Sequence, residues 1–339
     1  MPVILLNVAG VGIVSPVGLS ARQTSAAVRA GLSNFAELKG IVCSTGEPVI
    51  AAEVPYRLFS PTKLNDLAMR ALVEAIRDAN PPRGTALHVA IVTAERSRPG
   101  QPVDVETLQA DVIELLEDSH DLRFALYPYG HAGAGAAIAE LAETLNQSNC
   151  MGLIVAADSL LSLLSLQHLE RHGRLKSGHR VRGLIPGEAA AALVVAPVTY
   201  SPIRGSDDPC CRVAGIGTAM EPNPVGSEAP CLGEGLTTAI DAALASTEWR
   251  GLGIDRVFCD LNGEGYRTHE WMLVMRRSLQ HRSLAHPADC IGDVGAASLP
   301  MSIGLAVSEI RRSGGPLERV MAWASSDEGL RSAVCLERA

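Results

Sequence analysis

The stretch Val8-Ala9-Gly10-Val11-Gly12 returns 205 residues later as Val213-Ala214-Gly215-Ile216-Gly217 (213 − 8 = 205). Each copy is followed by a Pro-Val-Gly turn and then by a segment rich in Ala and Thr, at residues 20–32 and 233–246, that we expect to be helical. A short echo can arise by chance, but here the elements after it also recur in the same order. Such a repeat indicates a duplicated fold.

The remaining elements of each half extend the repeat. In the first half, the apolar patterns predict strands and helices at 86–94, 104–118, 123–128, 132–146, 152–158 and 189–197. In the second half, they predict them at 255–261, 266–280, 287–291, 295–312, 318–325 and 332–337. Both halves read β-α-β-α-β-α-β-β, which predicts an α/β fold with buried, mainly parallel sheets. Two successive strands at the end of each half add an antiparallel partner.

The Ser/Asp/Pro-rich segment 201–211 is the best boundary between the two halves. We therefore expect an N-terminal half at 1–200 and a C-terminal half at 211–339.

Composition excludes several classes of protein. The 339 residues include 37 acidic and 29 basic side chains, for a net charge of −8, and 47% are hydrophobic. A chain of this balance is not disordered, and without a basic block it is a poor nucleic-acid binder. The apolar runs are too short to span a membrane, and the amino terminus is typical of a buried strand, not of a signal peptide. Eight scattered cysteines without a CxxC pair favour reduced thiols and a cytoplasmic location.

Three motifs resemble those of the thiolase superfamily, and specifically of its β-ketoacyl synthase branch. They are the opening stretch 8–18, the segment from Arg174-Leu175-Lys176-Ser177 to Gly187-Glu188-Ala189-Ala190, and the turn Gly292-Asp293-Val294-Gly295-Ala296-Ala297. The resemblance implies a thiolase-like fold, in which the two similar halves form a layered α/β/α/β/α domain. It also implies a homodimer built by pairing of edge strands, and substrates carried as acyl-CoA or on an acyl carrier protein.

The positions that carry the chemistry of this family are all changed. In the family, a cysteine thiolate at a helix start takes the acyl group, and two histidines stabilise the carbanion. Here His131 stands in the cysteine position, or Ala132 if the alignment slips by one residue, while Asn262 and Asp293 replace the histidines. Cys150 lies past the far end of the same predicted helix and cannot substitute.

Two functions remain open on these grounds. The first is a non-catalytic scaffold or adaptor, with a vestigial acyl-thioester pocket and another protein as its client. The second is a divergent acyltransferase or acyl-thioester enzyme, in which His131 works with Asp293 or Glu264 as acid–base groups. Ala132, Glu188 and Glu264 are expected around the pocket, with Glu188 bonding backbone amides, and no cofactor or metal is expected.

Two other motifs suggest ligands but have simpler explanations. Gly10-x-Gly12 after a strand is typical of dinucleotide sites, yet its recurrence at Gly215 and Gly217 favours close packing of strand against helix. His168 and His172 are spaced for a metal, but the basic residues around them, Arg174 included, favour a solvated basic helix and loop. This basic stretch is also a hypothetical docking site for an acidic carrier protein.

Overall fold

The computed structural model describes residues 6–55, 63–100, 102–145, 150–200, 210–249, 252–277, 283–312 and 317–339. The first part contains β1 (Leu6–Val14), α1 (Ala21–Arg29), β2 (Ala36–Val42), β3 (Pro48–Ala51), α2 (Lys63–Ala79), β4 (Ala86–Val92), α3 (Val105–Leu116), β5 (Leu122–Tyr127), η1 (Gly130–Ala132), α4 (Gly133–Leu145), β6 (Cys150–Ser159), α5 (Leu163–Arg171) and β7 (Glu188–Pro197). The second part contains β8 (Cys211–Met220), α6 (Glu234–Ala245), β9 (Arg256–Cys259), α7 (Gly265–Arg277), β10 (Leu284–Ala285), α8 (Ala288–Ile291), η2 (Gly295–Ala297), α9 (Ser298–Ile310), β11 (Arg319–Ser325) and β12 (Leu330–Arg338).

The main sheet has ten strands in the order β10-β9-β11-β12-β8-β1-β7-β6-β4-β5. β1 and β8, which hold the repeated stretch, pair antiparallel in the middle of the sheet. Outward from β1, β7 and β6 pair antiparallel, and β4 and β5 then continue in parallel. Outward from β8, β12 and β11 follow antiparallel and β9 and β10 parallel. This topology confirms the predicted α/β class.

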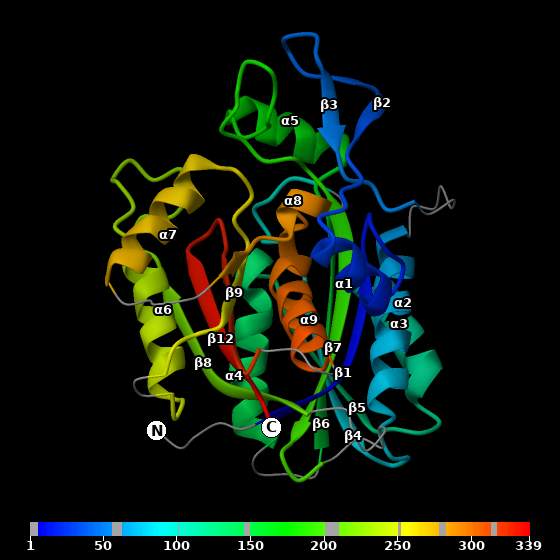
Figure 1. Ribbon diagram of the computed structural model, residues 1–339. Coiled ribbons are helices and arrows are strands. Elements are labelled where there is room, and N and C mark those ends of the chain that lie inside the picture. Colours follow the sequence, from blue (N-terminus) through cyan, green and yellow to red (C-terminus); the bar gives the residue numbers. More distant parts are fainter. Residues whose placement is uncertain are drawn as a thin grey trace.

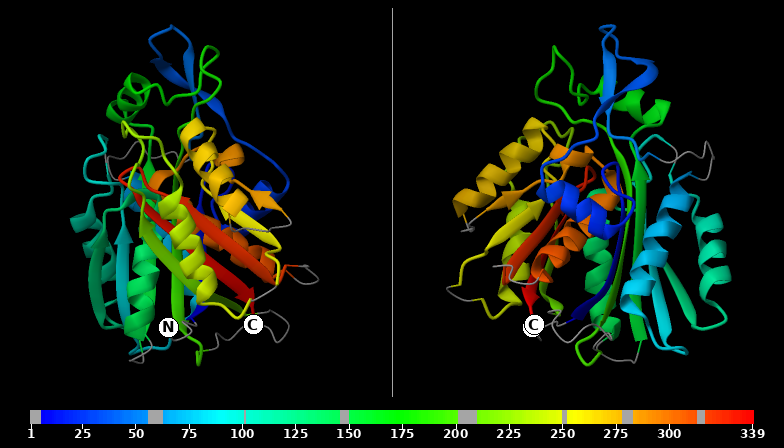
Figure 2. Two further views of the ribbon diagram at one scale, coloured as in Figure 1. Left: turned by 90° about the vertical axis from the view of Figure 1, so that its left-hand side faces the viewer. Right: turned by 45° about the vertical axis from the view of Figure 1, so that its right-hand side comes forward.

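Helices and sheet form the expected five layers (Figure 1, Figure 2). The central helices α4 and α9 lie between the two halves of the sheet, where α4 contacts β6, β8 and β12 and α9 contacts β1, β7 and β11. α2 and α3 cover one outer face, while α6 packs on β8 and β12 at the other and contacts α7. The start of α4 and the start of α9 meet through η1 and η2.

The repeated glycines allow each central strand to lie directly against an outer helix. A Cβ on Gly12 would lie 1.8 Å from the carbonyl oxygen of Ala71 in α2, and one on Gly217 would lie 2.0 Å from that of Ala239 in α6. Packing of strand on helix, and not a nucleotide, therefore accounts for the duplicated Gly-x-Gly. The helix that occupies this place in the first half is α2, so pairing 20–32 with 233–246 was wrong.

Other local predictions were also wrong. Residues 287–291 were expected to be a strand, but Pro287 starts the short helix α8, and the strand at this point is β10. α5 lies between β6 and β7, where the predicted element order had two successive strands, although a basic helix was expected around His168 and His172. The antiparallel hairpin of β2 and β3 was not predicted; together with α5 it projects from the layered body (Figure 1).

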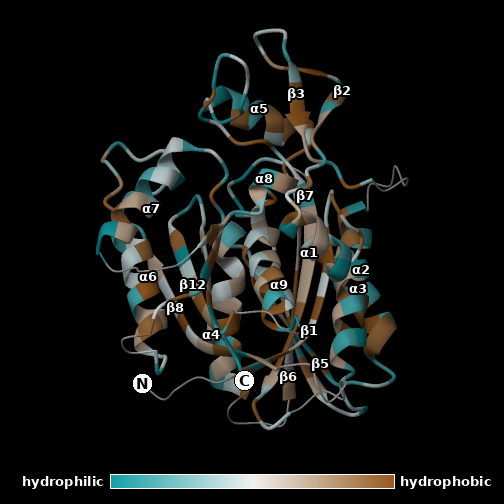
Figure 3. Cartoon of the chain, viewed as in Figure 1, coloured by the Kyte–Doolittle hydropathy of each residue, from teal (hydrophilic) through white to brown (hydrophobic). Residues whose placement is uncertain are grey.

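Colouring by hydropathy shows hydrophilic patches on α2, α3 and α5 (Figure 3). In the described parts of the chain, no helix has both the length and the apolar character needed to cross a bilayer.

All eight cysteines are free thiols; six are buried, and Cys43 and Cys210 are partly exposed. The predicted boundary at 201–211 falls, as far as residue 209, outside the described residues, so the division at 1–200 and 211–339 remains a prediction.

We expect Gly12→Ala and Gly217→Ala to destabilise the protein, because the added methyl group overlaps a helix carbonyl. The free energy of unfolding, measured by urea titration, should fall by about 1–3 kcal/mol or more for each. Gly253→Ala is the matched control: a Cβ there meets nothing within 4 Å, and the change should stay within about 0.5 kcal/mol. Equal effects at Gly12 and Gly253 would contradict the packing argument.

Candidate functional site

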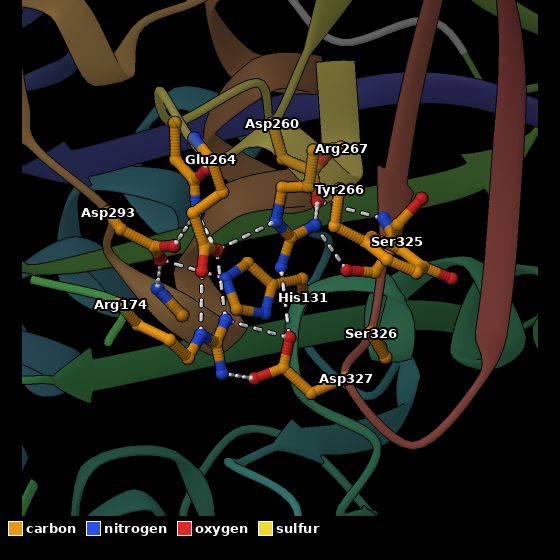
Figure 4. Close-up of polar contacts among 12 residues, drawn as sticks. His131, Arg174, Asp260, Glu264, Tyr266, Arg267, Asp293, Ser325, Ser326 and Asp327 are labelled. Carbon is orange, nitrogen blue, oxygen red and sulfur yellow. Dashed lines mark hydrogen bonds and ion pairs between the residues drawn. The ribbon is translucent and has the colours of Figure 1, made fainter. Parts of the chain in front are cut away.

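The three residues predicted to occupy the family's catalytic positions meet at one buried point. His131 lies in η1 at the start of α4, Asn262 follows β9, and Asp293 lies between α8 and η2. His131 Nε2 is 2.8 Å from Asp293 Oδ1, and the Asn262 amide donates to Asp293 Oδ2 at 2.6 Å (Figure 4). His131 and Asp293 are each 3% exposed. The fold thus brings the three together, while a catalytic role for them remains a prediction.

The electrostatics of this contact favour an imidazolium paired with a carboxylate. Burial lowers the pKa of His131, but the adjacent Asp293 carboxylate outweighs that effect and raises the pKa above its usual range. Burial raises the pKa of Asp293, yet His131, Arg267 and Asn262 together hold it well below its usual range. The Gly295 N–H also donates to Asp293 Oδ1, at 2.9 Å. Asp293 is therefore an anion with several donors and is poorly suited to accept a proton.

Glu264, expected near the pocket, joins the same cluster. The Asn262 amide donates to Glu264 Oε2 at 2.9 Å, and Arg174 binds both Glu264 oxygens at 2.6 and 2.9 Å. Arg174 also donates to Asp327 at 2.6 Å. The side chain of Arg174 is only 11% exposed, so placing it on a solvated basic loop was wrong. The exposed positions Lys176, His179, Arg180 and Arg182 do fit that description.

Arg267 is a second central residue that the motifs did not reveal. It is 1% exposed and donates to Asp260 at 2.5 Å, to the Ser325 carbonyl at 2.5 Å and to Asp327 at 3.3 Å. A signal was present in the sequence: Arg267 stands at helical spacing with Trp271 and Val274, which form the buried face of α7. An arginine on an apolar helix face indicates a buried partner.

At the start of each central helix, a backbone N–H donates a hydrogen bond to an acceptor from the other half of the molecule. The Ala132 N–H at the start of α4 donates to Ser326 Oγ, just after β11, at 2.9 Å. The Ala296 N–H at the start of α9 donates to Asp158 Oδ2 in β6 at 2.8 Å, and Asp158 also pairs with Arg98. The backbone amide of Ala132, the other candidate for the nucleophile position, is therefore already used.

The cluster as a whole carries more acids than bases. Three arginines and His131 face six carboxylic acids: Glu95, Asp158, Asp260, Glu264, Asp293 and Asp327. Burial raises the pKa values of Glu95 and Asp260 above their usual range. Glu95 accepts the Asp327 N–H at 3.0 Å.

Almost no free volume remains beside His131. The cavity there is lined by Arg98, His131, Leu160, Ser165, His168, Leu169, Arg174, Asp293 and Asp327. The space open to the centre of a water molecule is about 10 Å³, which is at most enough for one water. Nδ1 of His131 has no hydrogen-bond partner among the described residues. The side chains around His131 thus leave little room beside its imidazole.

Glu188 is not among the residues that line the cavity beside His131, whereas His168 of the histidine pair is. Glu188 Oε1 accepts the Val54 N–H at 3.0 Å and pairs with Lys63 at 2.5 Å, in keeping with the expected bond to a backbone amide. The rings of His168 and His172 are 4.3 Å apart, but within the described ranges no third metal ligand joins them.

We expect the stability of Asp293→Asn, relative to the original chain, to depend on pH through His131. Between about pH 5 and pH 6.5 the unfolded histidine is protonated and the unfolded aspartate is ionised, so the full stabilisation of the pair is present. The loss of unfolding free energy there should be about 3–5 kcal/mol. It should shrink as the pH rises through the raised pKa of His131, because the neutral imidazole no longer needs the anion.

Urea unfolding from about pH 5.5 to about pH 9 measures this difference. Asp289→Asn is the control, since Asp289 is 73% exposed and pairs with His286 at the surface; its effect should stay below about 1 kcal/mol. A loss for Asp293→Asn that grows with pH would exclude an imidazolium at position 131.

Comparison with known proteins finds no matching family model and no matching curated protein. Solved structures do match over the whole chain. A complex of a type II polyketide synthase acyl-carrier protein with its ketosynthase aligns with a TM-score of 0.77 at 15% identity, covering 100% of both chains. The ketosynthase in complex with its chain length factor from Xenorhabdus doucetiae gives 0.76 at 13%, covering 98% of each. The ishigamide ketosynthase/chain length factor gives 0.74 at 16%, covering 99% of each.

At these identities the likeness concerns the fold. Together with the sheet order and the five layers, it confirms the fold that the resemblance implied. The chain has the thiolase-like fold of the ketosynthases.

Proposed function

We propose that this chain is a non-catalytic ketosynthase-like subunit that acts as a scaffold or adaptor through protein contact. The observation that carries the proposal is the ion pair of His131 with Asp293, beside which the cavity has room for at most one water. A subunit with this fold, but without space or nucleophile for an acyl group, can still offer its surface to a partner.

Condensation by the family's route requires a thiolate and donors that stabilise an enolate. At the corresponding positions this chain presents an imidazole already bound to a carboxylate, and the anionic Asp293 would oppose a developing negative charge. The amide of Asn262 is bound to Asp293 and Glu264 and is not available to a substrate.

The acid–base alternative is less well supported. The Asp293 carboxylate raises the pKa of His131 and so favours the protonated imidazole, which cannot accept a proton as a general base must. Glu264 is held by two contacts to Arg174, and Asp293 is held by three donors. An enzyme of this kind would first have to break the buried ion pairs to admit a substrate.

The proposed partner surface is the sheet edge formed by β5. β5 pairs with β4 on one side and is the last strand in the sheet order, and Leu126 on it is 40% exposed. An exposed edge strand is a template for pairing with another chain. We propose that a second copy pairs here antiparallel, as the family resemblance implies, and that a carrier protein or client binds the resulting dimer. The free thiols favour a cytoplasmic location.

We expect no turnover of acyl thioesters by the purified chain, because His131 and Asp293 are bound to each other and the cavity beside them holds at most one water. Incubation with acetyl-CoA and malonyl-CoA should release no CoA above background and leave the intact mass unchanged. His131→Ala should behave identically. The scaffold proposal is refuted if the original chain releases CoA and His131→Ala does not.

We expect Leu126→Arg to convert a dimer into a monomer, since it places a charge on the pairing edge. Light scattering coupled to chromatography gives the mass in solution. Leu163→Arg is the matched control, because Leu163 is 59% exposed on α5, which projects from the layered body away from β5 (Figure 1); it should leave the mass unchanged. A monomeric original chain would argue against homodimerisation at β5.

A further inference from the structure

A second buried polar cluster lies in the C-terminal part of the chain and plays no part in the site around His131. Glu221 follows β8, Cys231 precedes α6, and Glu270 lies in α7. One ligand atom from each lies within 4.8 Å of the other two. The three residues are 3%, 5% and 0% exposed, so the group is closed to bulk water.

One oxygen of this cluster lacks a partner. Glu221 Oε2 accepts the Gly235 N–H at 2.8 Å, whereas Oε1 is buried and has no hydrogen-bond partner among the described residues. A buried carboxylate oxygen in this state costs free energy unless a donor or a cation reaches it. This orphaned oxygen is an observation separate from the clustering of the acids.

The cluster also carries a negative charge that a bound cation would compensate. Arg331, fully buried, donates to Glu270 Oε1 at 2.7 Å, and Ser325 Oγ donates to Glu270 Oε2 at 2.8 Å. Arg331 therefore compensates Glu270 and leaves the Glu221 carboxylate as excess negative charge. A divalent cation together with a Cys231 thiolate would make the whole cluster neutral.

We propose that Glu221, Cys231 and Glu270 bind one zinc ion. Thiolate and carboxylate oxygens are both ligands of zinc, and a bound water can complete four-coordination. Cys231 Sγ lies 3.8 Å from Glu270 Oε1, close to the ~3.6 Å that tetrahedral zinc bonds of ~2.3 and ~2.1 Å require. On binding, the Sγ–H proton leaves to solvent and the sulfur forms the metal bond.

The surrounding contacts suit this role. Ligating carboxylates in metal sites are themselves hydrogen-bonded, which orients them toward the ion. Arg331 and Ser325 do this for Glu270, and the Gly235 N–H does it for Glu221. The ion would join the end of β8 and the segment before α6 to α7. Its role is to stabilise the fold, and the site is independent of the proposed scaffold function.

The test uses the full chain with Cys43→Ser and Cys210→Ser, which removes the two partly exposed thiols. After dialysis against a chelator, Cd²⁺ is added as a spectroscopic probe and Zn²⁺ as the proposed ligand. We expect a cadmium–thiolate absorption band that saturates at one equivalent, and a Zn²⁺-dependent rise in melting temperature. Cys231→Ser should abolish the band, and Glu221→Gln should weaken Zn²⁺ binding roughly tenfold or more.

Cys290→Ser is the matched control, because Cys290 is 6% exposed and lies outside the cluster; it should keep the band. Circular dichroism checks that each variant is folded. If Cys231→Ser fails to fold, a second measurement on the background chain replaces it. Peptide mass spectrometry then tests whether bound Zn²⁺ protects Cys231 from alkylation. A band that persists in Cys231→Ser, no band at all, or no protection of Cys231 would overturn the proposal.

Discussion

Two helix N-termini face each other at the centre of this fold, and the buried chemistry follows from that constraint. The starts of α4 and α9 each present unpaired N–H groups and partial positive charge. Ser326 and Asp158 accept the N–H groups of Ala132 and Ala296, and each acceptor comes from the opposite half of the sheet. Asp293 accepts the Gly295 N–H and binds His131. The same ion pair therefore links both helices.

The charged side chains that compensate one another also occupy the space around His131. Positive helix ends attract acids, and the acids in turn need the guanidinium groups of Arg174, Arg267 and Arg98. A buried pair adds little net stability over an apolar alternative, but removal of one partner is costly. The network is consequently hard to open once formed. A substrate entering beside His131 would have to replace several charged contacts at once, which favours a structural role for the cluster.

Sequence alone predicted the fold well because its signals are local. The Gly-x-Gly repeat, the strand and helix order and the Gly292–Ala297 turn each depend on neighbouring residues, and the meeting of His131, Asn262 and Asp293 followed from the family resemblance. Arg174 was misplaced because its partners Glu264 and Asp327 lie 90 and 153 residues away. α2 was missed although Leu67, Ala71 and Ala75 show helical spacing. No recognisable sequence motif contains Glu221, Cys231 and Glu270, and these residues come together only in the folded structure.

The replacements at positions 131 and 293 make physical sense as a pair. The family resemblance implies an anionic thiolate at the start of α4 and an imidazole at the position of Asp293. This chain has the imidazole at the start of α4 and the anion at the second position, so the sign of each partner is reversed while an attraction across the contact is kept. An imidazolium alone at a helix N-terminus would be repelled by the partial positive charge there. Asp293 removes that repulsion by pairing with His131. The two replacements therefore keep an ion pair at this contact although the residue type at each position has changed.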